Sequence, residues 1–515
     1  MRKLPLAVGA LAAALTATTL SAASPAQALD EVNTTKLRNA VTVNGILAHE
    51  RVLQRIANQN DGTRSSGTPG YAASAKYVKQ QLKSYGYKVT EQTFTFPFWR
   101  ELAPSALSEV SPTARDFETG GFTYSGNGSV TGTVVPTTDV QVPPGPTPSS
   151  SNSGCEPGDF TPASATAPQI ALTQRGTCDF VVKAQNAQAA GYDAVIIFNE
   201  GQPGRTDVLD GTLGSPAVEI PVVGLSFADG SALYAETQAG PVTVTATTQT
   251  ETDLNATTSN VIADSPGGNA DKTVVVGAHL DSVAEGPGIN DNGSGSATIL
   301  EIAKQMQELK IKPKQKVRFA FWGAEEFGLL GSAHYVENLS DAKLAKIYAN
   351  LNFDMLGSPN YARLVYDGDG SAFDVPGPPG SGQIESLFTS YFDSKGLATE
   401  PTEFDGRSDY EAFTLAGIPA GGLFSGAEVV KTPEQVALYG GTAGVAFDPC
   451  YHQACDTINN LSTKALNELG DGAAHAVATL ALSKSGFFED GSRVAAAPKK
   501  KSSSAARYLG SHAVS

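Results

Sequence analysis

The sequence predicts an α/β protein, in which helices cover both faces of a mostly parallel mixed sheet and an α+β module is inserted. Three observations lead to this prediction. The chain has 515 residues, more than one compact core normally holds. After residue 255, short apolar segments alternate with helical ones, as they do around parallel sheets. Residues 116–249, in contrast, are rich in Gly, Pro, Ser and Thr and contain only short apolar segments.

Residues 1–28 have the features of a secretory signal peptide. A basic start at Arg2 and Lys3 precedes an apolar run that ends in the cleavage pattern Ala26-Gln27-Ala28. We therefore expect a secreted, extracellular protein whose mature chain begins near Leu29. No later run is apolar and long enough to predict a membrane span. Residues 491–515 form a basic, low-complexity tail.

The main domain is assigned to residues 29–115 and 250–490. It is expected to begin with an amphipathic helix over residues 68–86, whose apolar face is Ala72, Ala75, Val78, Leu82 and Tyr85. A strand with alternating polarity follows over residues 87–96. Later strands are predicted at 273–280, 317–322, 348–355 and 417–424. Helices are expected near 293–309, 326–337, 382–396 and 463–484.

The inserted module, residues 116–249, is predicted to consist of short strands around a helix. Its strands are expected at 128–135, 168–174, 193–200, 218–226 and 241–249, and its helix at 179–193. The chain has four cysteines, and an even count in an exported protein predicts disulfides. We expect neighbours to pair, Cys155 with Cys178 and Cys450 with Cys455. Loop-closure entropy gives these bridges about 3.5 and about 2 kcal/mol.

The charge of the chain excludes one class of partner. The net charge is −16, and it becomes −23 when the signal peptide (+2) and the tail (+5) are left out. So acidic a protein is not expected to bind nucleic acid.

Residues with metal-binding side chains follow the predicted strands of the main domain. They are His279, Asp281, Asp291, Glu325, Glu326 and Asp354, and a late loop adds Tyr451 and His452. Parallel sheets bind ligands at the carboxyl ends of their strands, so we expect these side chains at one edge of the sheet.

Two histidines and several carboxylates form a ligand set that suits zinc. Two ions need only five ligands if one carboxylate bridges them, and the natural five are His279, Asp291, Glu326, Asp354 and His452. Glu325 is then left over. Because neighbouring residues of an extended chain point in opposite directions, Glu326 can bind metal while Glu325 acts as general base toward a water.

Each of these positions also has a simpler explanation. A strand-end aspartate such as Asp291 usually caps the next helix, and adjacent glutamates usually serve a helix dipole. A lone His452 is more often structural than a ligand, and His49, His334 and His475 are expected to be structural because they lie on helical faces. The metal site is favoured because five positions converge on one edge.

Several segments together resemble a known family. They are "GAHLDSV", "GINDNGSGSA", "FWGAEEFGLLGSAHY", "NFDMLGS", "GRSDYEAF" and "DPCYHQACDT". They are similar to the secreted bacterial leucine-aminopeptidase family, the co-catalytic two-zinc exopeptidases of the aminopeptidase Y-like type, over roughly residues 30–115 and 250–485. The inserted module, with "ALTQRGTCDFVVKAQNAQAAGYDAVIIFN", resembles a protease-associated (PA) domain.

The resemblance implies the zinc aminopeptidase fold and two Zn²⁺ per chain. His279 and Asp354 would bind one ion, Glu326 and His452 the other, and Asp291 would bridge them. Glu325 matches the general base. Further roles are implied for residues that orient ligands, hold the tetrahedral intermediate or contact substrate, namely Asp281, Tyr451, Arg407 and Met355. A Ca²⁺ ion is compatible with the family but has no signature in this sequence.

The expected activity is the release of an N-terminal residue, preferably large and apolar, from peptides and proteins. We expect a monomer in which the module forms a lid or wall beside the cleft. Three alternatives stay open. A carboxypeptidase on the same scaffold would need a cationic anchor, for which Arg407 is the candidate. A single-zinc cyclase of the related fold is less favoured, because His279 and Asp291 complete a second metal site. A receptor-like ectodomain with an inactive site would be expected to have lost Glu325 or a ligand, and none is lost.

Overall fold

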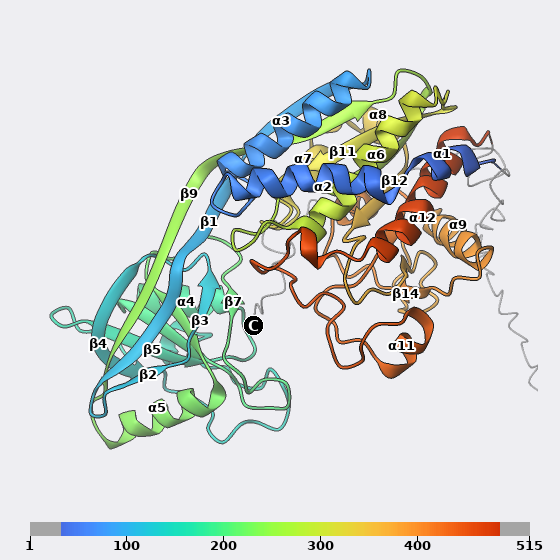
Figure 1. The fold of residues 1–515 in the computed structure, drawn as a ribbon. Coiled ribbons are helices and arrows are strands. Elements are labelled where there is room, and N and C mark those ends of the chain that lie inside the picture. The colour runs from blue at the N-terminus through green and yellow to red at the C-terminus, as the bar shows by residue number, and fades with distance from the viewer. Residues whose placement is uncertain (1–31, 485–515) are drawn as a thin grey trace, which may run out of the picture.

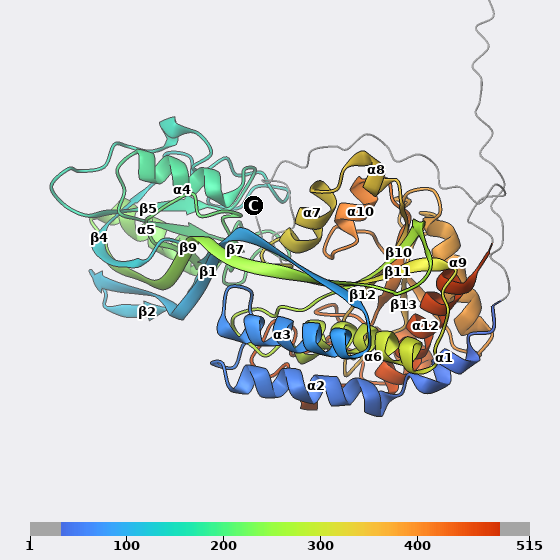
Figure 2. The same ribbon diagram turned by 90° about the horizontal axis from the view of Figure 1, so that it is seen from above.

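The computed structural model describes residues 32–484 (Figure 1). The predicted signal peptide, residues 1–28, and the basic tail, residues 491–515, lie outside the described residues. Two parts are visible, a larger main domain and the inserted module, and two long strands join them (Figures 1 and 2). No helix within residues 32–484 is both long and apolar enough to cross a bilayer.

The centre of the main domain is a mostly parallel sheet. Four parallel strands lie in the order β15-β12-β10-β11, and they are β10 (Asn269–His279), β11 (Gln315–Trp322), β12 (Ile347–Asp354) and β15 (Ala420–Phe424). β9 (Thr243–Asp264) lies antiparallel beside β11. At the other side, β13 (Leu364–Tyr366) pairs antiparallel with β15 and parallel with β14 (Glu400–Thr402). The predicted α/β architecture is confirmed.

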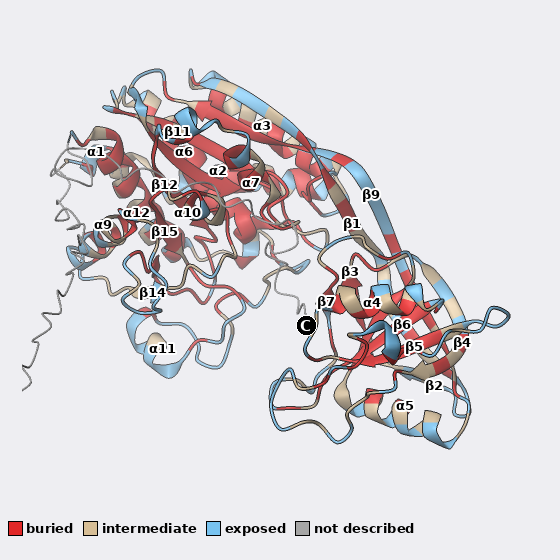
Figure 3. Ribbon diagram, turned by 180° about the vertical axis from the view of Figure 1, so that it is seen from behind, coloured by how far each residue is buried: buried red, intermediate tan, exposed pale blue. Residues whose placement is uncertain are grey.

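Helices cover both faces of this sheet (Figure 2). The core on one face includes residues of α1 (Thr35–Ala40), α2 (Val43–Asn58), α3 (Pro69–Ser84), α6 (Gly295–Glu308), α9 (Ser381–Asp393) and α12 (Thr463–Leu482). The other face packs against α7 (Leu330–Glu337), α8 (Asp341–Leu344) and α10 (Glu411–Leu415). Val274 and Val276 of β10 face the first core and Val275 faces the second, as the two-residue period of a strand requires. Figure 3 shows that the central strands are buried on both sides.

Some predicted details of the helices were wrong. In α3, Ala72 is exposed and Tyr71 is buried instead, because Tyr71 packs in the main core and its hydroxyl donates to the carbonyl of Ser259. The helix predicted from residue 326 begins only at Leu330. The segment before it forms a loop, because Ala324 and Leu329 both adopt a positive φ that no helix can contain. Helices α1 and α2 were not predicted as elements.

Two long antiparallel strands connect the main domain and the module. β1 (Lys88–Ser111) pairs with β9 from Lys88 opposite Asp264 to Ser111 opposite Thr243. The strand predicted over 87–96 is thus the first part of a longer one. Both strands pass from the main domain into the module without a break, and the boundaries near residues 115 and 250 stay a proposal.

The module continues the sheet beyond β9. Its strands are β2 (Arg115–Phe117), β3 (Gly120–Thr123), β4 (Gly128–Pro136), β5 (Gln169–Gln174), β6 (Ala194–Phe198), β7 (Gly211–Thr212) and β8 (Val222–Leu225). The predicted helix α4 (Phe180–Ala189) packs on one face, and α5 (Phe227–Ala239), which was not predicted, packs on the other. The Cys155–Cys178 bridge, with a Cα–Cα distance of 5.8 Å, is formed as predicted.

Candidate metal centre and active site

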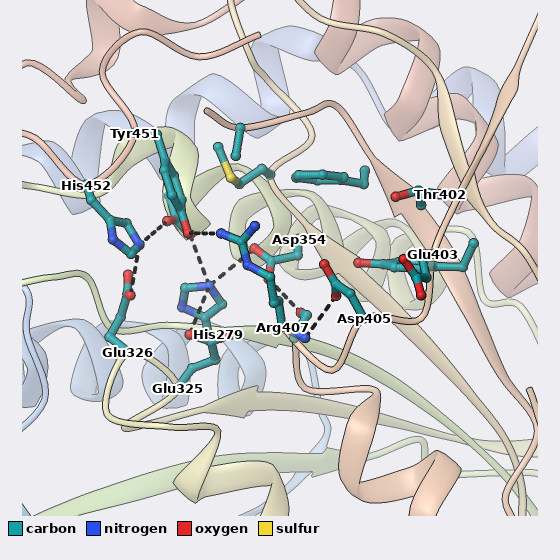
Figure 4. Close-up of a pocket in the computed structure, with 16 residues that line it drawn as sticks. His279, Glu325, Glu326, Asp354, Thr402, Glu403, Asp405, Arg407, Tyr451 and His452 are labelled. Atoms are coloured by element: carbon teal, nitrogen blue, oxygen red, sulfur yellow. Dashed lines mark hydrogen bonds and ion pairs between the residues drawn. The ribbon is translucent and has the colours of Figure 1, made fainter. Parts of the chain in front are cut away.

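The predicted site residues lie around one cavity at the carboxyl ends of the central strands (Figure 4). The cavity wall includes all five predicted ligands together with Glu325, Tyr451, Arg407 and Met355. Asp281 does not line the cavity and lies behind His279.

The five predicted ligands form two groups that share one member. His279 Nε2 lies 3.2 Å from Asp291 Oδ1 and 3.2 Å from Asp354 Oδ1. His452 Nε2 lies 3.2 Å from Asp291 Oδ2 and 3.2 Å from Glu326 Oε2. In each group of three, one potential ligand atom per residue lies within 4.8 Å of the others. Asp291 therefore presents one carboxylate oxygen to each group.

The fold positions these side chains with abrupt turns at the strand ends. His279 is the last residue of β10, Asp354 the last of β12, and the two glutamates follow β11. Three residues beside them have a positive φ, Ala324 (54°), Met355 (50°) and His452 (56°). This left-handed region is disfavoured for residues with a Cβ, so the surrounding structure must hold them there. The turns let consecutive side chains diverge immediately after a strand.

A layer of polar groups behind the ligands fixes their positions. The carboxylate of Asp456 accepts hydrogen bonds from the backbone N–H groups of Asn290 (2.9 Å) and Asp291 (3.0 Å). The hydroxyl of Ser408 donates to Asp354 Oδ2 at 2.6 Å. Neither residue was predicted, although both lie inside the segments "DPCYHQACDT" and "GRSDYEAF".

Asp281 contacts His279 in two ways. His279 Nδ1 lies 3.2 Å from the backbone oxygen of Asp281 and 3.7 Å from its carboxylate. The same carboxylate accepts the backbone N–H of Glu325 at 3.3 Å. Asp281 thus links the loop that carries Glu325 to the strand end that carries His279.

The electrostatics of the site are those of buried carboxylates around two imidazoles. Burial by itself lowers the pKa of His279, but the charges of Glu325 and Asp354 outweigh it and hold that pKa well above its ordinary value. At His452, Glu326 and Asp291 likewise outweigh burial and raise the pKa to about 10. Burial raises the pKa of Glu326 to about 7 and that of Glu325 well above its ordinary value. The site therefore attracts positive charge strongly.

The donor set fits divalent metal ions. One oxygen of the Glu326 carboxylate, Oε1, is buried without a hydrogen-bond partner, although its other oxygen faces His452. Imidazole nitrogens with carboxylate oxygens are typical ligands of Zn²⁺. Among the described residues that line the cavity, Arg407 is the only permanently charged cation, so carboxylates are in excess.

Tyr451 and Arg407 border the metal-ligand groups on the solvent side. The rings of Tyr451 and His452 are stacked with their centroids 3.9 Å apart. Arg407 Nη2 donates to the Tyr451 hydroxyl at 3.4 Å, and Nη1 donates to Glu428 at 2.7 Å. The cavity continues past Met355 to side chains that were not predicted, namely Tyr366, Thr402, Glu403, Asp405 and Phe424. Sequence spacing gave no signal for these, because they come from strands and loops at the far side of the sheet.

The loop that carries Tyr451 and His452 is closed by the predicted Cys450–Cys455 bridge, with a Cα–Cα distance of 5.3 Å. The three histidines expected to be structural lie away from the cavity. His49 is within hydrogen-bond distance of Tyr77 (2.7 Å) and Glu301 (3.2 Å), and His475 of Thr34 (2.9 Å). His334 stacks on Phe94 with ring centroids 4.7 Å apart.

Comparisons with known proteins identify the family of this chain. The sequence pattern of peptidase family M28 matches residues 260–477, and that of the PA domain matches residues 130–233. An aminopeptidase of Pseudomonas aeruginosa is 45% identical over 501 residues, which are 93% of this chain and 91% of the relative. Leucine aminopeptidase 2 of Trichophyton equinum is 40% identical over 88% of this chain and 86% of the relative.

Two solved structures are also similar. The aminopeptidase from Aneurinibacillus sp. strain AM-1 superposes with a TM-score of 0.68 at 28% identity, covering 88% of this chain and 97% of that one. BSAP, a zinc aminopeptidase from Bacillus subtilis, gives a TM-score of 0.62 at 27% identity, covering 87% of this chain and 98% of that one. The chain therefore belongs to peptidase family M28, and a PA domain is inserted in its peptidase domain.

Proposed function

We propose that this protein is a secreted, zinc-dependent aminopeptidase that releases N-terminal residues, preferably large and apolar ones, from peptides and proteins. As a member of family M28 with aminopeptidase relatives, the chain is a metalloaminopeptidase. One observation carries the finer proposal. Two metal-ligand groups share Asp291, and Glu325, a buried carboxylate outside both groups, lines the same cavity with its Oε2 4.0 Å from His279 Nε2.

We assign His279 and Asp354 to one zinc ion and Glu326 and His452 to a second, with Asp291 contributing to both. When bound, the two ions supply Lewis-acid polarisation of the scissile carbonyl and lower the pKa of a water nucleophile toward neutrality.

Glu325 is the general base in this proposal. Its side chain is nearly buried, with the residue 4% exposed, and burial raises the pKa of its carboxyl, which makes the carboxylate a stronger base. The hydrogen bond from its backbone N–H to Asp281 fixes the loop from which it projects. Glu325 takes a proton from the attacking water and passes it to the leaving amine. The Tyr451 hydroxyl, held beside Arg407, donates to the oxygen on which negative charge develops.

The cavity suits a free N-terminus. Asp354, Glu403 and Asp405 lie along its wall with Glu325, and these carboxylates favour an α-ammonium group. Met355, Tyr366 and Phe424 provide apolar surface for the side chain of the N-terminal residue. Arg407, the candidate anchor for a carboxypeptidase, already pairs with Glu428. Removal of an N-terminal residue is therefore favoured over removal of a C-terminal one.

A further acidic group carries no metal assignment. Asp367, Asp369 and Glu385 lie close enough to hold a cation. The carboxylates of Asp367 and Glu385 already accept backbone N–H groups of the adjoining loop, which explains the cluster without an ion. No residues are assigned to a Ca²⁺ ion, which the sequence left open, and the monomeric state stays a prediction.

A panel of aminoacyl-p-nitroanilides tests the proposal. We expect Leu, Phe and Met derivatives to be hydrolysed fastest, with activity lost on chelation and restored by Zn²⁺. Metal analysis should give two zinc ions per chain, and one ion in fully active enzyme would contradict the shared role of Asp291. Hippuryl-type substrates should not be hydrolysed, and rapid hydrolysis of them would favour the carboxypeptidase alternative.

A further inference from the structure

A second cavity lies between the PA domain and the peptidase domain. The PA domain contributes Thr123 and Tyr124, the connecting strand β1 contributes Trp99, and the peptidase domain contributes Ala284 and Phe327. We call this cavity the interdomain groove.

The interdomain groove adjoins the active-site cavity. Glu326 and His452 line both the active-site cavity and the groove. These two residues belong to one metal-ligand group, whereas His279 and Asp354 line only the active-site cavity. The two cavities therefore meet at the Glu326–His452 side of the proposed zinc pair.

The direction of the substrate follows from charge. The N-terminal ammonium belongs among the carboxylates at the Asp354, Glu403 and Asp405 side of the active-site cavity. The scissile bond of an aminopeptidase substrate lies one residue further along the chain. The peptide must then leave past Glu326 and His452, where the groove begins.

Three aromatic side chains line the groove, Trp99, Tyr124 and Phe327, together with the charged side chains of Arg100 and Glu285. Trp99 Nε1 donates to the carbonyl of Ser125 at 3.1 Å, and the Tyr124 hydroxyl donates to the carbonyl of Pro97 at 3.2 Å. With these polar atoms already bonded, the rings offer mainly apolar contact. Phe327 is held by Phe96 and Phe98, with ring centroids 4.9 Å and 5.8 Å away. The groove is thus preformed, and its chemistry suits an apolar or aromatic side chain.

We infer that the interdomain groove binds the residue that follows the scissile bond and selects a large apolar or aromatic side chain there. The PA domain is then part of the substrate site through Thr123 and Tyr124, beside Trp99 of β1. This inference rests on the proposed aminopeptidase activity, because only that activity places the second residue of the substrate at this end of the cavity.

The inference is tested by filling the groove. Ala284→Trp places an indole in it, and Thr123→Trp does so from the opposite wall in case the first variant fails to fold. The matched control is Ala232→Trp, at an exposed position of α5, which lies at the outer end of the PA domain (Figure 1). The substrates are Leu-amide, Leu-Gly-amide and Leu-Phe-amide, which share an N-terminal residue and differ only after the scissile bond.

Wild-type enzyme should show a kcat/KM for Leu-Phe-amide at least about tenfold above that for Leu-Gly-amide, the discrimination that an apolar pocket typically gives. A groove-filling variant should lose most of that preference, because its kcat/KM for Leu-Phe-amide should fall much more than its kcat/KM for Leu-amide. The Ala232→Trp control should behave as wild type on all three substrates. Equal wild-type rates on Leu-Gly-amide and Leu-Phe-amide, or an equal loss on all three substrates in both folded groove variants, would overturn the inference.

Fluorescence gives a second readout that needs no catalysis. The chain has two tryptophans. Trp99 lines the groove, and Trp322 is 0% exposed within the sheet. Titration of metal-free protein with Gly-Phe-Gly, which carries Phe after the scissile bond, should change tryptophan emission, whereas Gly-Gly-Gly should not. If Leu-amide is hydrolysed but Gly-Phe-Gly leaves the emission unchanged, the groove assignment is wrong and the proposed function stands. If no substrate is hydrolysed, the proposed function fails, and the titration still decides whether the groove binds an aromatic residue.

Discussion

Removal of the Cys450–Cys455 bridge should weaken metal binding more than it weakens the fold. Within the bridged loop, Tyr451 and His452 are half-buried and the next residues are exposed, so packing holds the loop only weakly. Its two ends are anchored by buried carboxylates. Asp448 accepts the backbone N–H of Cys450 at 2.9 Å, and Asp456 binds the backbone of Asn290 and Asp291. The double substitution Cys450→Ser/Cys455→Ser therefore frees the tip of a loop whose ends stay fixed.

The size of the effect follows from the loop length. The bridge spans a sequence separation of 5, and loop-closure entropy assigns such a crosslink about 2 kcal/mol. If zinc binding at His452 must restore that order, affinity at this ion falls by about 30-fold, since about 1.4 kcal/mol corresponds to a factor of ten. The ion held by His279 and Asp354 should be unaffected.

Competitive zinc titration against a chromogenic chelator measures this change. We expect one weakened site, reduced turnover at limiting zinc and recovery at high zinc. The melting temperature of the fully metallated protein should fall only slightly. The matched control is Cys155→Ser/Cys178→Ser, which opens a loop with a sequence separation of 23 in the module and should lower stability without changing zinc affinity. The reasoning is refuted if the 450/455 variant keeps both zinc affinities and loses as much melting temperature as the control. Free thiols at both positions in the purified enzyme would remove its premise.

Three further predictions address the glutamates, the layer behind the ligands and pH. Glu325→Gln should retain both zinc ions by metal analysis and lose about 10²–10⁴-fold in kcat. Glu326→Ala should lose zinc as well as activity. Zinc release from Glu325→Gln would mean that the roles of the two glutamates are reversed. Asp456→Ala leaves the buried N–H groups of Asn290 and Asp291 without their acceptor, which costs about 1–3 kcal/mol in stability of this loop. Because the loop carries Asp291, which is assigned to both ions, a chelator titration should show weaker zinc binding at both. Burial and the charge of Arg38 lower the pKa of His475 to about 4, so the folded state binds this proton less readily than the unfolded state does. The free energy of unfolding should therefore be highest above about pH 6.5 and fall as the pH drops toward 4. After discounting for the partial exposure of the imidazole, the loss is about 2 kcal/mol. Urea unfolding across this range should show a steeper loss for wild type than for His475→Gln, and parallel curves would contradict the assignment.

Residue type and strand position were enough to predict much of the site. His279, Asp354 and the glutamate pair end strands whose apolar runs are plain in the sequence, and parallel strands bring such ends to one edge. The residues that hold the ligands were not predictable in the same way. Asp456 acts through backbone N–H groups of a distant loop, and Ser408 through one carboxylate oxygen. No spacing rule in the sequence marks such contacts.

The length of β1 was missed for a different reason. Its pattern is interrupted by Pro97 and Pro104, and proline cannot donate to a strand ladder. The structure accommodates both at irregularities in the pairing with β9, between Phe96 and Phe98 and between Ala103 and Ala106. The local sequence therefore predicts that the strand ends before Pro97, whereas pairing with β9 extends it to Ser111.

The paired strands β1 and β9 also bear on how such a protein can arise. Phe96 lies opposite Ala256, and neighbouring strands are about 5 Å apart. The chain therefore leaves and re-enters the peptidase domain along two paired strands, whose facing residues are as close as the ends of a tight hairpin. A genetic exchange that replaced everything between them with a short turn would leave the order and register of the catalytic sheet unchanged. The reverse exchange could insert a different domain at the same place. The β1–β9 pair is therefore a position at which evolution can replace the domain next to the active site without moving the candidate metal ligands.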